Sequence, residues 1–309
     1  MAAVIASVIL NDMERSDFAA HGFRSWMLQQ VSHPYEVVIN LFNDQADRFR
    51  ELAKNRNPLC DAVIKVFPRP AFFNISAANN LGLHVASGEY VLFCNSDVIF
   101  PSCYLATAVE EMTRHGVSYA DAWRVNLGPT PTKALAPPLS YDGTTNYDFL
   151  VERESQTPAG GVCAWLARRE VARAIGGFDP RVLCHEDKDF EARILHYLSR
   201  NGAQRIVCTL KGLRGFHLFH EASELYNLSR AAKAIVEPRR YRLLVDPASS
   251  EDVVPTQLGS LQALLSDLAE GRPPHWSIGS ALRSAKGLRW ARNAYRRGWA
   301  AVRAFRSPV

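Results

Sequence analysis

Apolar runs alternate with amphipathic stretches along the first third of the chain. Continuous apolar segments are typical of strands that are covered on both faces. We therefore expect strands over residues 3–10, 35–41, 62–67 and 90–94, and helices over residues 18–30, 47–54, 75–86 and 104–115. This alternation predicts an α/β fold, with a mostly parallel central sheet flanked by helices.

The middle of the chain is less regular. Residues 128–148 are rich in Pro, Thr and Tyr and predict a long loop that is well placed to shape an acceptor pocket. Gly176-Gly177 is a good C-terminal stop for a helix. We expect a strand over residues 158–166 after a glycine turn, helices over 168–175 and 190–200, and a last strand over 205–210.

Composition indicates an ordinary globular protein. Apolar residues make up 47% of the 309 residues and charged residues 22%, and the net charge of +5 does not by itself argue for nucleic acid. The six cysteines form no C-x-x-C pair, which favours reduced thiols in a cytosolic protein. The apolar N-terminus lacks a basic region, so we interpret it as a strand rather than a signal peptide. No apolar run approaches the roughly 18 to 20 residues of a membrane-spanning helix.

The segment Asn95-Ser96-Asp97 follows the expected strand over residues 90–94. Because a strand alternates its faces, we expect Asn95 and Asp97 to point the same way. Two such oxygen-bearing side chains can hold a divalent metal, at the strand end where open α/β sheets bind ligands. Taken alone, the tripeptide is better explained as an ordinary polar turn.

Several motifs, taken in order and spacing, resemble family 2 nucleotide-sugar glycosyltransferases, whose fold is called GT-A. The resemblance covers roughly residues 4 to 221. It implies the GT-A (Rossmann-like) fold, transfer of a sugar from a nucleotide-diphosphate donor to a hydroxyl acceptor with inversion, and a Mn²⁺ or Mg²⁺ cofactor. The matching segments are Asn80-Leu81-Gly82, Ser87-Gly88-Glu89-Tyr90, Asn95-Ser96-Asp97, Gly176-Gly177-Phe178-Asp179, and Glu186-Asp187 with Asp189.

The resemblance also implies roles for the site residues. Asp97 would be the metal carboxylate, and Asn95 stands where the family has an acid, so it offers a weaker amide ligand. His217 or His220 would complete the metal site, and we favour His217. Residues expected to bind the donor are Asn11, Glu14, Asp44, Asn80, Asn95, Ser96 and Asp97.

On the acceptor side, Asp187 is the expected catalytic base, because the aspartate of the family's E-D pair deprotonates the acceptor hydroxyl. Glu186 could share that role or bind the acceptor, and Asp189 could position the loop or the helix that follows. Gly160 and Gly161 would let the backbone approach the acceptor closely. The alternative is that the three acids only cap a helix that begins near residue 190.

We expect a catalytic domain over residues 1–225, with a donor half to about residue 100, and a helical extension over 226–309. Residues 280–306 contain no acid and place Leu288, Tyr295, Trp299 and Val302 on one helical stripe among arginines. This pattern is typical of a helix on an anionic membrane surface. Packing on the domain, or a free arm, would explain it equally well.

Two other functions compete with glycosyl transfer. A catalytically inactive module that binds a glycan or a nucleotide sugar is favoured only by Asn95. A sugar-1-phosphate nucleotidyltransferase would need a Gly-rich loop with Arg and Lys after the first strand, and residues 10–15 offer none. The sugar, the nucleotide and the acceptor stay open.

Overall fold

The computed structural model describes residues 3–13, 15–70, 73–127, 135, 159–180, 182, 186–202 and 208–219. They form two compact units. The first comprises Met1–Arg69, Leu81–Glu170 and Cys208–Glu221, and the second takes its described residues from Pro70–Asn80 and Val171–Val207. The predicted extension over 226–309 and its basic segment lie outside the described residues, as does the predicted 128–148 loop except for Leu135.

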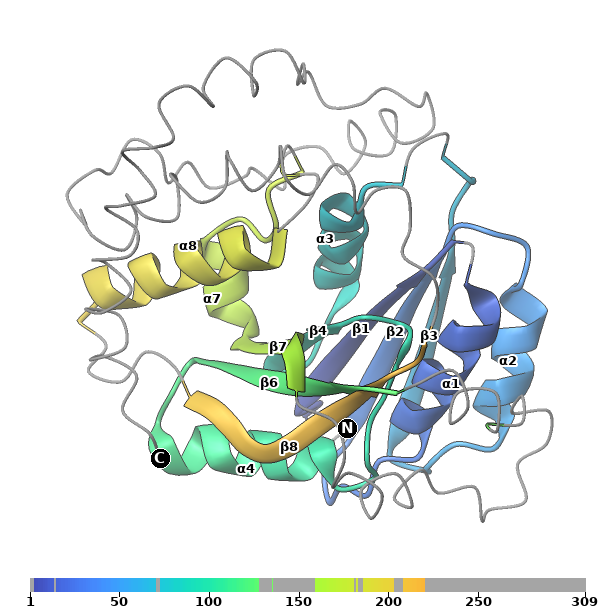
Figure 1. Ribbon diagram of the computed structural model, residues 1–309, viewed down its shortest axis with the longest axis horizontal. Helices are drawn as coiled ribbons and strands as arrows, with labels where there is room; N and C mark the ends of the chain where they lie inside the picture. Colours follow the sequence, from blue (N-terminus) through green and yellow to red (C-terminus); the bar gives the residue numbers. More distant parts are fainter. Residues whose placement is uncertain are drawn as a thin grey trace. The chain divides into compact units, whose positions relative to one another are not determined.

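An eight-stranded sheet forms the centre of the first unit, in the order β3-β2-β1-β4-β7-β6-β8-β5 (Figure 1). Parallel pairs join β1 to β2 and β4, β2 to β3, and β6 to β8, whereas β7 runs antiparallel to β4 and β6, and β5 antiparallel to β8. The expected α/β class is confirmed. The strands are β1 (Ala6–Asp12), β2 (Tyr35–Leu41), β3 (Cys60–Val66), β4 (Tyr90–Cys94), β5 (Val98–Ile99), β6 (Tyr119–Asn126), β7 (Ala159–Arg168) and β8 (Cys208–His217).

Helices cover this sheet with apolar faces. The helices are α1 (Ser16–Met27), α2 (Ala46–Lys54), α3 (Ile75–Val85, shared between the units) and α4 (Tyr104–His115). In Figure 1, α1 and α2 lie side by side, and Phe23 meets Phe49 between them with ring centroids 5.3 Å apart. Trp26 of α1 packs on Phe100 and Tyr104. These contacts bury α1 against the start of α4.

The bounds of β2, β4 and α4 are those predicted from the sequence. β1 ends at Asp12 instead of residue 10, because its polar end is stabilised by hydrogen bonds described below. β5 and β6 were not predicted. Gly160 and Gly161 lie within β7, so the predicted glycine turn is wrong at these positions.

The turn before β4 explains the Ser87-Gly88 pair. Glu36 Oε1 accepts hydrogen bonds from Ser7 Oγ at 2.5 Å and from the Ser87 N–H at 2.6 Å, and Ser7 Oγ in turn accepts one from the Gly88 N–H at 2.8 Å. A Cβ on Gly88 would lie 2.5 Å from the Ala6 carbonyl carbon. Only glycine lets β4 start this close to β1.

The second unit contains α8 (Glu186–Arg200) and the part of α7 (Arg169–Ala174) that begins at Val171. Gly176 and Gly177 have φ of 76° and 71°, the left-handed conformation that ends helices, so the predicted stop is confirmed. Phe178 then stacks on Phe190 of α8 with ring centroids 4.1 Å apart. The turn after α7 is therefore packed directly on α8.

Candidate functional site

Asn95, Ser96 and Asp97 form the turn between β4 and β5. β4 ends at Cys94, and β5 begins at Val98 and pairs with β8 instead of continuing beside β1. The expectation that strand alternation aligns Asn95 with Asp97 is therefore wrong, because the chain has left the strand at this point. Asp97 is 6% exposed, whereas Asn95 and Ser96 are partly exposed.

Asp97 is held between two basic side chains. Arg15 Nη1 donates a hydrogen bond to Asp97 Oδ2 at 3.0 Å, and His217 Nε2 lies 3.6 Å from the same oxygen. The backbone carbonyl of Asp97 accepts a hydrogen bond from the Leu218 N–H at 2.9 Å. These three contacts fix a nearly buried carboxylate at the edge where β1, β2 and β4 end.

His217 reaches Asp97 through strand pairing. It is the last residue of β8 and lies opposite Val98 of β5, while on its other side it pairs with Asn126 of β6. The predicted last strand, over 205–210, is too short, since β8 runs to His217. The structure thus brings together His217 and Asp97, as the sequence predicted, and His220 lies outside the described residues.

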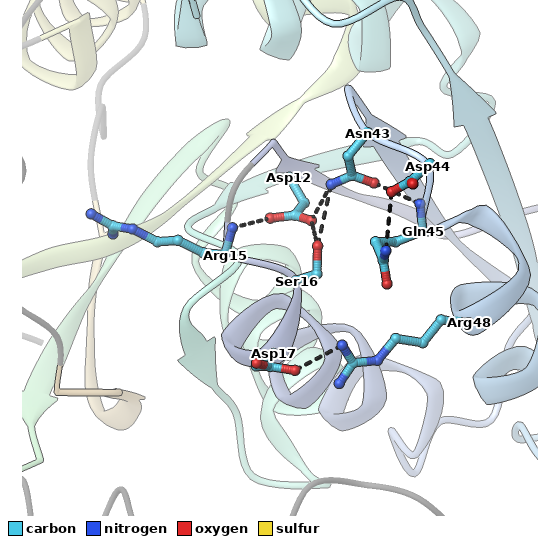
Figure 2. A network of polar contacts seen from close by, with 8 residues as sticks. All are labelled: Asp12, Arg15, Ser16, Asp17, Asn43, Asp44, Gln45 and Arg48. Carbon is cyan, nitrogen blue, oxygen red and sulfur yellow. Dashed lines mark hydrogen bonds and ion pairs between the residues drawn. The ribbon is translucent and has the colours of Figure 1, made fainter.

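Asp12, at the end of β1, was missed by the sequence analysis. Its carboxylate accepts hydrogen bonds from the Arg15 N–H at 3.1 Å, from Ser16 Oγ at 2.7 Å and from Asn43 Nδ2 at 2.7 Å. Figure 2 shows this network, which ties the end of β1 to the start of α1 and to the loop after β2. Asp12 lies four positions before α1, and no local motif marked it as a site residue.

The other donor residues predicted near β1 and β2 are Asn11, Glu14 and Asp44. Asn11 is buried and accepts a hydrogen bond from Asn40 Nδ2 at 2.9 Å, which gives it a role inside the sheet. Asp44 is exposed and accepts one from Gln45 Nε2 at 3.0 Å. Glu14 lies outside the described residues. Donor binding by these residues stays a prediction.

Asn80 is 1% exposed and pairs with a backbone segment of the second unit. Its Nδ2 donates to the Phe178 carbonyl and its Oδ1 accepts from the Phe178 N–H, both at 2.8 Å. These two hydrogen bonds fix the Gly176-Gly177-Phe178-Asp179 turn. The structure therefore gives Asn80 a positioning role, and its contact with the donor stays a prediction.

The acids after that turn lie inside α8 and not before it, because the helix begins at Glu186 instead of residue 190. Burial is the larger cause, and the neighbouring Asp187 carboxylate the smaller, of a shift that raises the pKa of Glu186 to about 8. Glu186 thus keeps its proton at neutral pH. Asp187 lies beside it in the first helical turn, where the helix dipole favours negative charge.

Asp189 has a structural partner. It is 1% exposed and accepts a hydrogen bond from Arg193 Nε at 2.8 Å, and Arg193 is itself fully buried. Arg193 Nη1 also donates to the carbonyl groups of Ile175 at 2.9 Å and Gly177 at 2.6 Å. This buried ion pair positions the glycine turn, as the sequence analysis allowed for Asp189.

The donor set for a metal in the first unit is small. Across residues the structure describes, no three His, Cys, Asp or Glu side chains gather closely enough to hold an ion. Asp97 and His217 offer one carboxylate and one imidazole. Mg²⁺ and Mn²⁺ at phosphate sites need only one or two protein carboxylates, because substrate phosphates supply the other ligands. The pair therefore fits an ion that binds together with a phosphate.

Residues 25–176 match the family model described as Glycosyl transferase family 2. No curated protein matches the chain in sequence. In the described part of the chain, no helix has the length and hydrophobicity needed to cross a bilayer.

Solved structures share the fold. S. aureus TarS is 16% identical with a TM-score of 0.52, and the match covers 79% of this chain but only 40% of TarS. TarS residues 1–349 in complex with UDP-GlcNAc are 14% identical with a TM-score of 0.55, and the match covers 79% of this chain and 67% of that TarS chain. Mannosyltransferase PcManGT from Pyrobaculum calidifontis, in complex with GDP-Man and Mn²⁺, is 17% identical with a TM-score of 0.53. That match covers 98% of this chain and 85% of PcManGT. At this identity the likeness shows the GT-A fold alone.

Proposed function

Because the chain belongs to glycosyl transferase family 2, we propose that it transfers a sugar from a nucleoside-diphosphate donor to a hydroxyl group of a carbohydrate or lipid-linked acceptor. The observation that carries the proposal is the environment of Asp97, a nearly buried carboxylate flanked by Arg15 and His217 at the carboxyl edge of the sheet. A leaving diphosphate gains negative charge, which Arg15 and a cation held by Asp97 would stabilise. Donors of this kind are bound in the TarS and PcManGT complexes.

We propose an inverting displacement. The acceptor oxygen attacks the anomeric carbon while the bond from that carbon to the diphosphate breaks, and the nucleoside diphosphate leaves. The hydroxyl proton passes to the Asp187 carboxylate, which acts as the general base. Glu186 retains its proton at neutral pH, so it can donate a hydrogen bond to the acceptor without competing for the transferred proton.

A divalent cation, Mn²⁺ or Mg²⁺, would be held by Asp97 and His217, with the Asn95 amide oxygen as a weaker ligand. When bound, such an ion neutralises charge on the departing phosphate. The Mn²⁺ in the PcManGT complex supports this choice of cofactor.

A donor panel tests the proposed function. We expect one of UDP-, GDP- or dTDP-sugars to raise the thermal midpoint, because a ligand that binds only the folded state stabilises it. The same donor should release its nucleoside diphosphate in the presence of Mn²⁺. Asp97→Asn should lose turnover, whereas Asp47→Asn, an exposed acid of α2, should keep it. Full turnover in Asp97→Asn would contradict the proposal.

A binding module without activity is the second candidate, favoured by the neutral Asn95 beside Asp97. The same panel separates the two functions. A donor that stabilises the protein but releases no nucleotide, with or without Mn²⁺, would support the binding module.

We also propose that the protein works at the cytosolic face of a membrane, with residues 280–306 as its contact surface. Only the sequence supports this proposal, since a basic helix with an apolar stripe binds anionic lipid. Flotation with anionic liposomes should be lost when the chain is cut before Ser280. Equal flotation of both forms would contradict the proposal.

A further inference from the structure

Arg15 lies on one carboxylate oxygen of Asp97, the residue proposed to hold the metal. Its Nη1 is 3.0 Å from Asp97 Oδ2, and His217 Nε2 approaches the same oxygen at 3.6 Å. The Arg15 side chain is 36% exposed, whereas that of Asp97 is 9% exposed. The guanidinium thus meets the carboxylate from the solvent side, which is the side from which a cation or a donor would arrive.

The backbone that carries Arg15 is fixed. Its N–H is bound by Asp12, and Asp12 is in turn held by Ser16 and Asn43. In Figure 2 the Arg15 side chain points away from Asp12. A fixed backbone with a long, partly exposed side chain lets the guanidinium change partners without any movement of the helix.

Charge balance at Asp97 favours such an exchange. Asn95 is neutral, so the turn between β4 and β5 offers Asp97 as its single carboxylate. One guanidinium neutralises one carboxylate. A divalent ion on the same oxygen would place two cationic groups against one another, and like charges at such short range repel. A divalent ion that binds Oδ2 therefore competes with Arg15 for that oxygen.

We propose that Arg15 is an internal cation that covers Asp97 until a divalent ion and a diphosphate arrive, and that it then binds the diphosphate. A guanidinium is suited to both partners, because its N–H fork matches carboxylate and phosphate oxygens. The inference rests on the proposed function, since it requires Asp97 to be a metal ligand. It makes Arg15 a positioning residue that sets the order in which metal and donor bind.

Metal binding without turnover tests the inference. Binding of Mn²⁺ alone is measured by calorimetry and by the loss of the free Mn²⁺ paramagnetic signal, first without additive and then with inorganic pyrophosphate. We expect Arg15→Gln to bind Mn²⁺ alone about two- to fivefold more tightly than the wild type, the range expected for loss of one partly exposed ion pair. It should bind pyrophosphate with Mn²⁺ about tenfold more weakly, because a charged hydrogen bond is lost.

Two variants serve as controls. Arg15→Lys keeps the charge and should bind Mn²⁺ as the wild type does. Arg48→Gln removes the same charge from an ion pair with Asp17, at 2.8 Å, that involves neither Asp97 nor His217, and both affinities should be unchanged. Thermal unfolding of each variant establishes that it is folded.

The outcomes separate the inference from the proposed function. If Arg15→Gln leaves either affinity at the wild-type value, the role of Arg15 is overturned while the metal site stands. If Asp97→Asn binds Mn²⁺ as tightly as the wild type, or if neither the wild type nor Arg15→Gln binds it, the metal site itself is overturned and the inference with it. Binding of Mn²⁺ that is detectable only in Arg15→Gln supports the inference.

Discussion

Gly22 determines how closely α1 approaches the turn between β4 and β5. A Cβ on Gly22 would lie 2.1 Å from the Ser96 carbonyl oxygen and 3.0 Å from the Val98 carbonyl oxygen. Both atoms belong to the backbone, so no side-chain rotation relieves the overlap. We predict that Gly22→Ala forces α1 and the Ser96 turn apart.

A steric clash and a gain in helix propensity have opposite effects on the stability of Gly22→Ala. Contacts between heavy atoms are favourable near 3.5 Å, so the added carbon requires a shift of about 1 Å or more. Overpacking of this kind typically costs about 1–3 kcal/mol, and a clash with rigid backbone places this site at the upper end. Alanine gains about 1 kcal/mol over glycine in helix propensity. The net loss is about 2 kcal/mol, which corresponds to a fall of about 4–8 °C in the thermal midpoint for a unit of this size.

The assay combines thermal unfolding with Mn²⁺ binding, because the displaced turn carries Asp97. Gly22→Ala should lose both stability and metal affinity. Gly116→Ala is the matched control. Gly116 has φ of 62° and no atom within 4 Å of its built Cβ, so alanine costs about 1 kcal/mol through its backbone conformation alone. This control should lower the midpoint without changing Mn²⁺ affinity. A higher midpoint for Gly22→Ala would show that helix propensity outweighs the clash and would refute the reasoning.

Three further predictions concern the acids of α8. Asp187→Asn should abolish transfer and leave donor affinity within about twofold, as measured by calorimetry and product analysis, and normal turnover would exclude Asp187 as the base. Glu186 binds its proton more tightly in the folded state, since its pKa is raised from 4.5 to about 8, so its contribution to stability is complete below pH 4.5 and is lost as pH rises to about 8. The thermal midpoint should therefore fall less steeply over that range in Glu186→Gln than in the wild type, and parallel profiles would contradict the assignment. Asp189→Leu should destabilise the second unit by about 3–5 kcal/mol in thermal unfolding, because it leaves the Arg193 charge buried without its carboxylate. Asp47→Leu, which breaks an exposed pair, should cost at most about 1 kcal/mol, and equal losses would speak against burial as the cause.

The sequence predicts the first half of the fold well because three of its strands, β1, β2 and β4, are buried throughout. Every residue of β1 and β2 is buried, so the hydrophobic run alone marks each strand. β6 gives no such signal, because it carries Asp121 and Arg124 among its apolar residues. β5 is two residues long and exists through its pairing with β8.

The candidate site could be predicted only in part. Asp97 and His217 were found from motif order, and their contact required a strand that runs seven residues further than its local pattern indicated. Arg15 lies 82 positions from Asp97, so no local pattern could join the two. Asp12 was missed for a similar reason, since one of its partners, Asn43, lies 31 positions away.

The pairing of β8 with β5 and β6 has a consequence for the growing polypeptide. Asp97 and Arg15 leave the ribosome more than a hundred residues before His217. His217 lies at the end of β8 and reaches Asp97 only when β8 pairs with β5 and β6. A nascent chain that ends before Cys208 can therefore form the β1–β4 pairs and the Arg15–Asp97 contact while it still lacks the imidazole. Loop closure over such a separation is entropically costly, so the His217 contact should be among the last to form. A chain whose synthesis is incomplete therefore lacks the His217 imidazole beside Asp97.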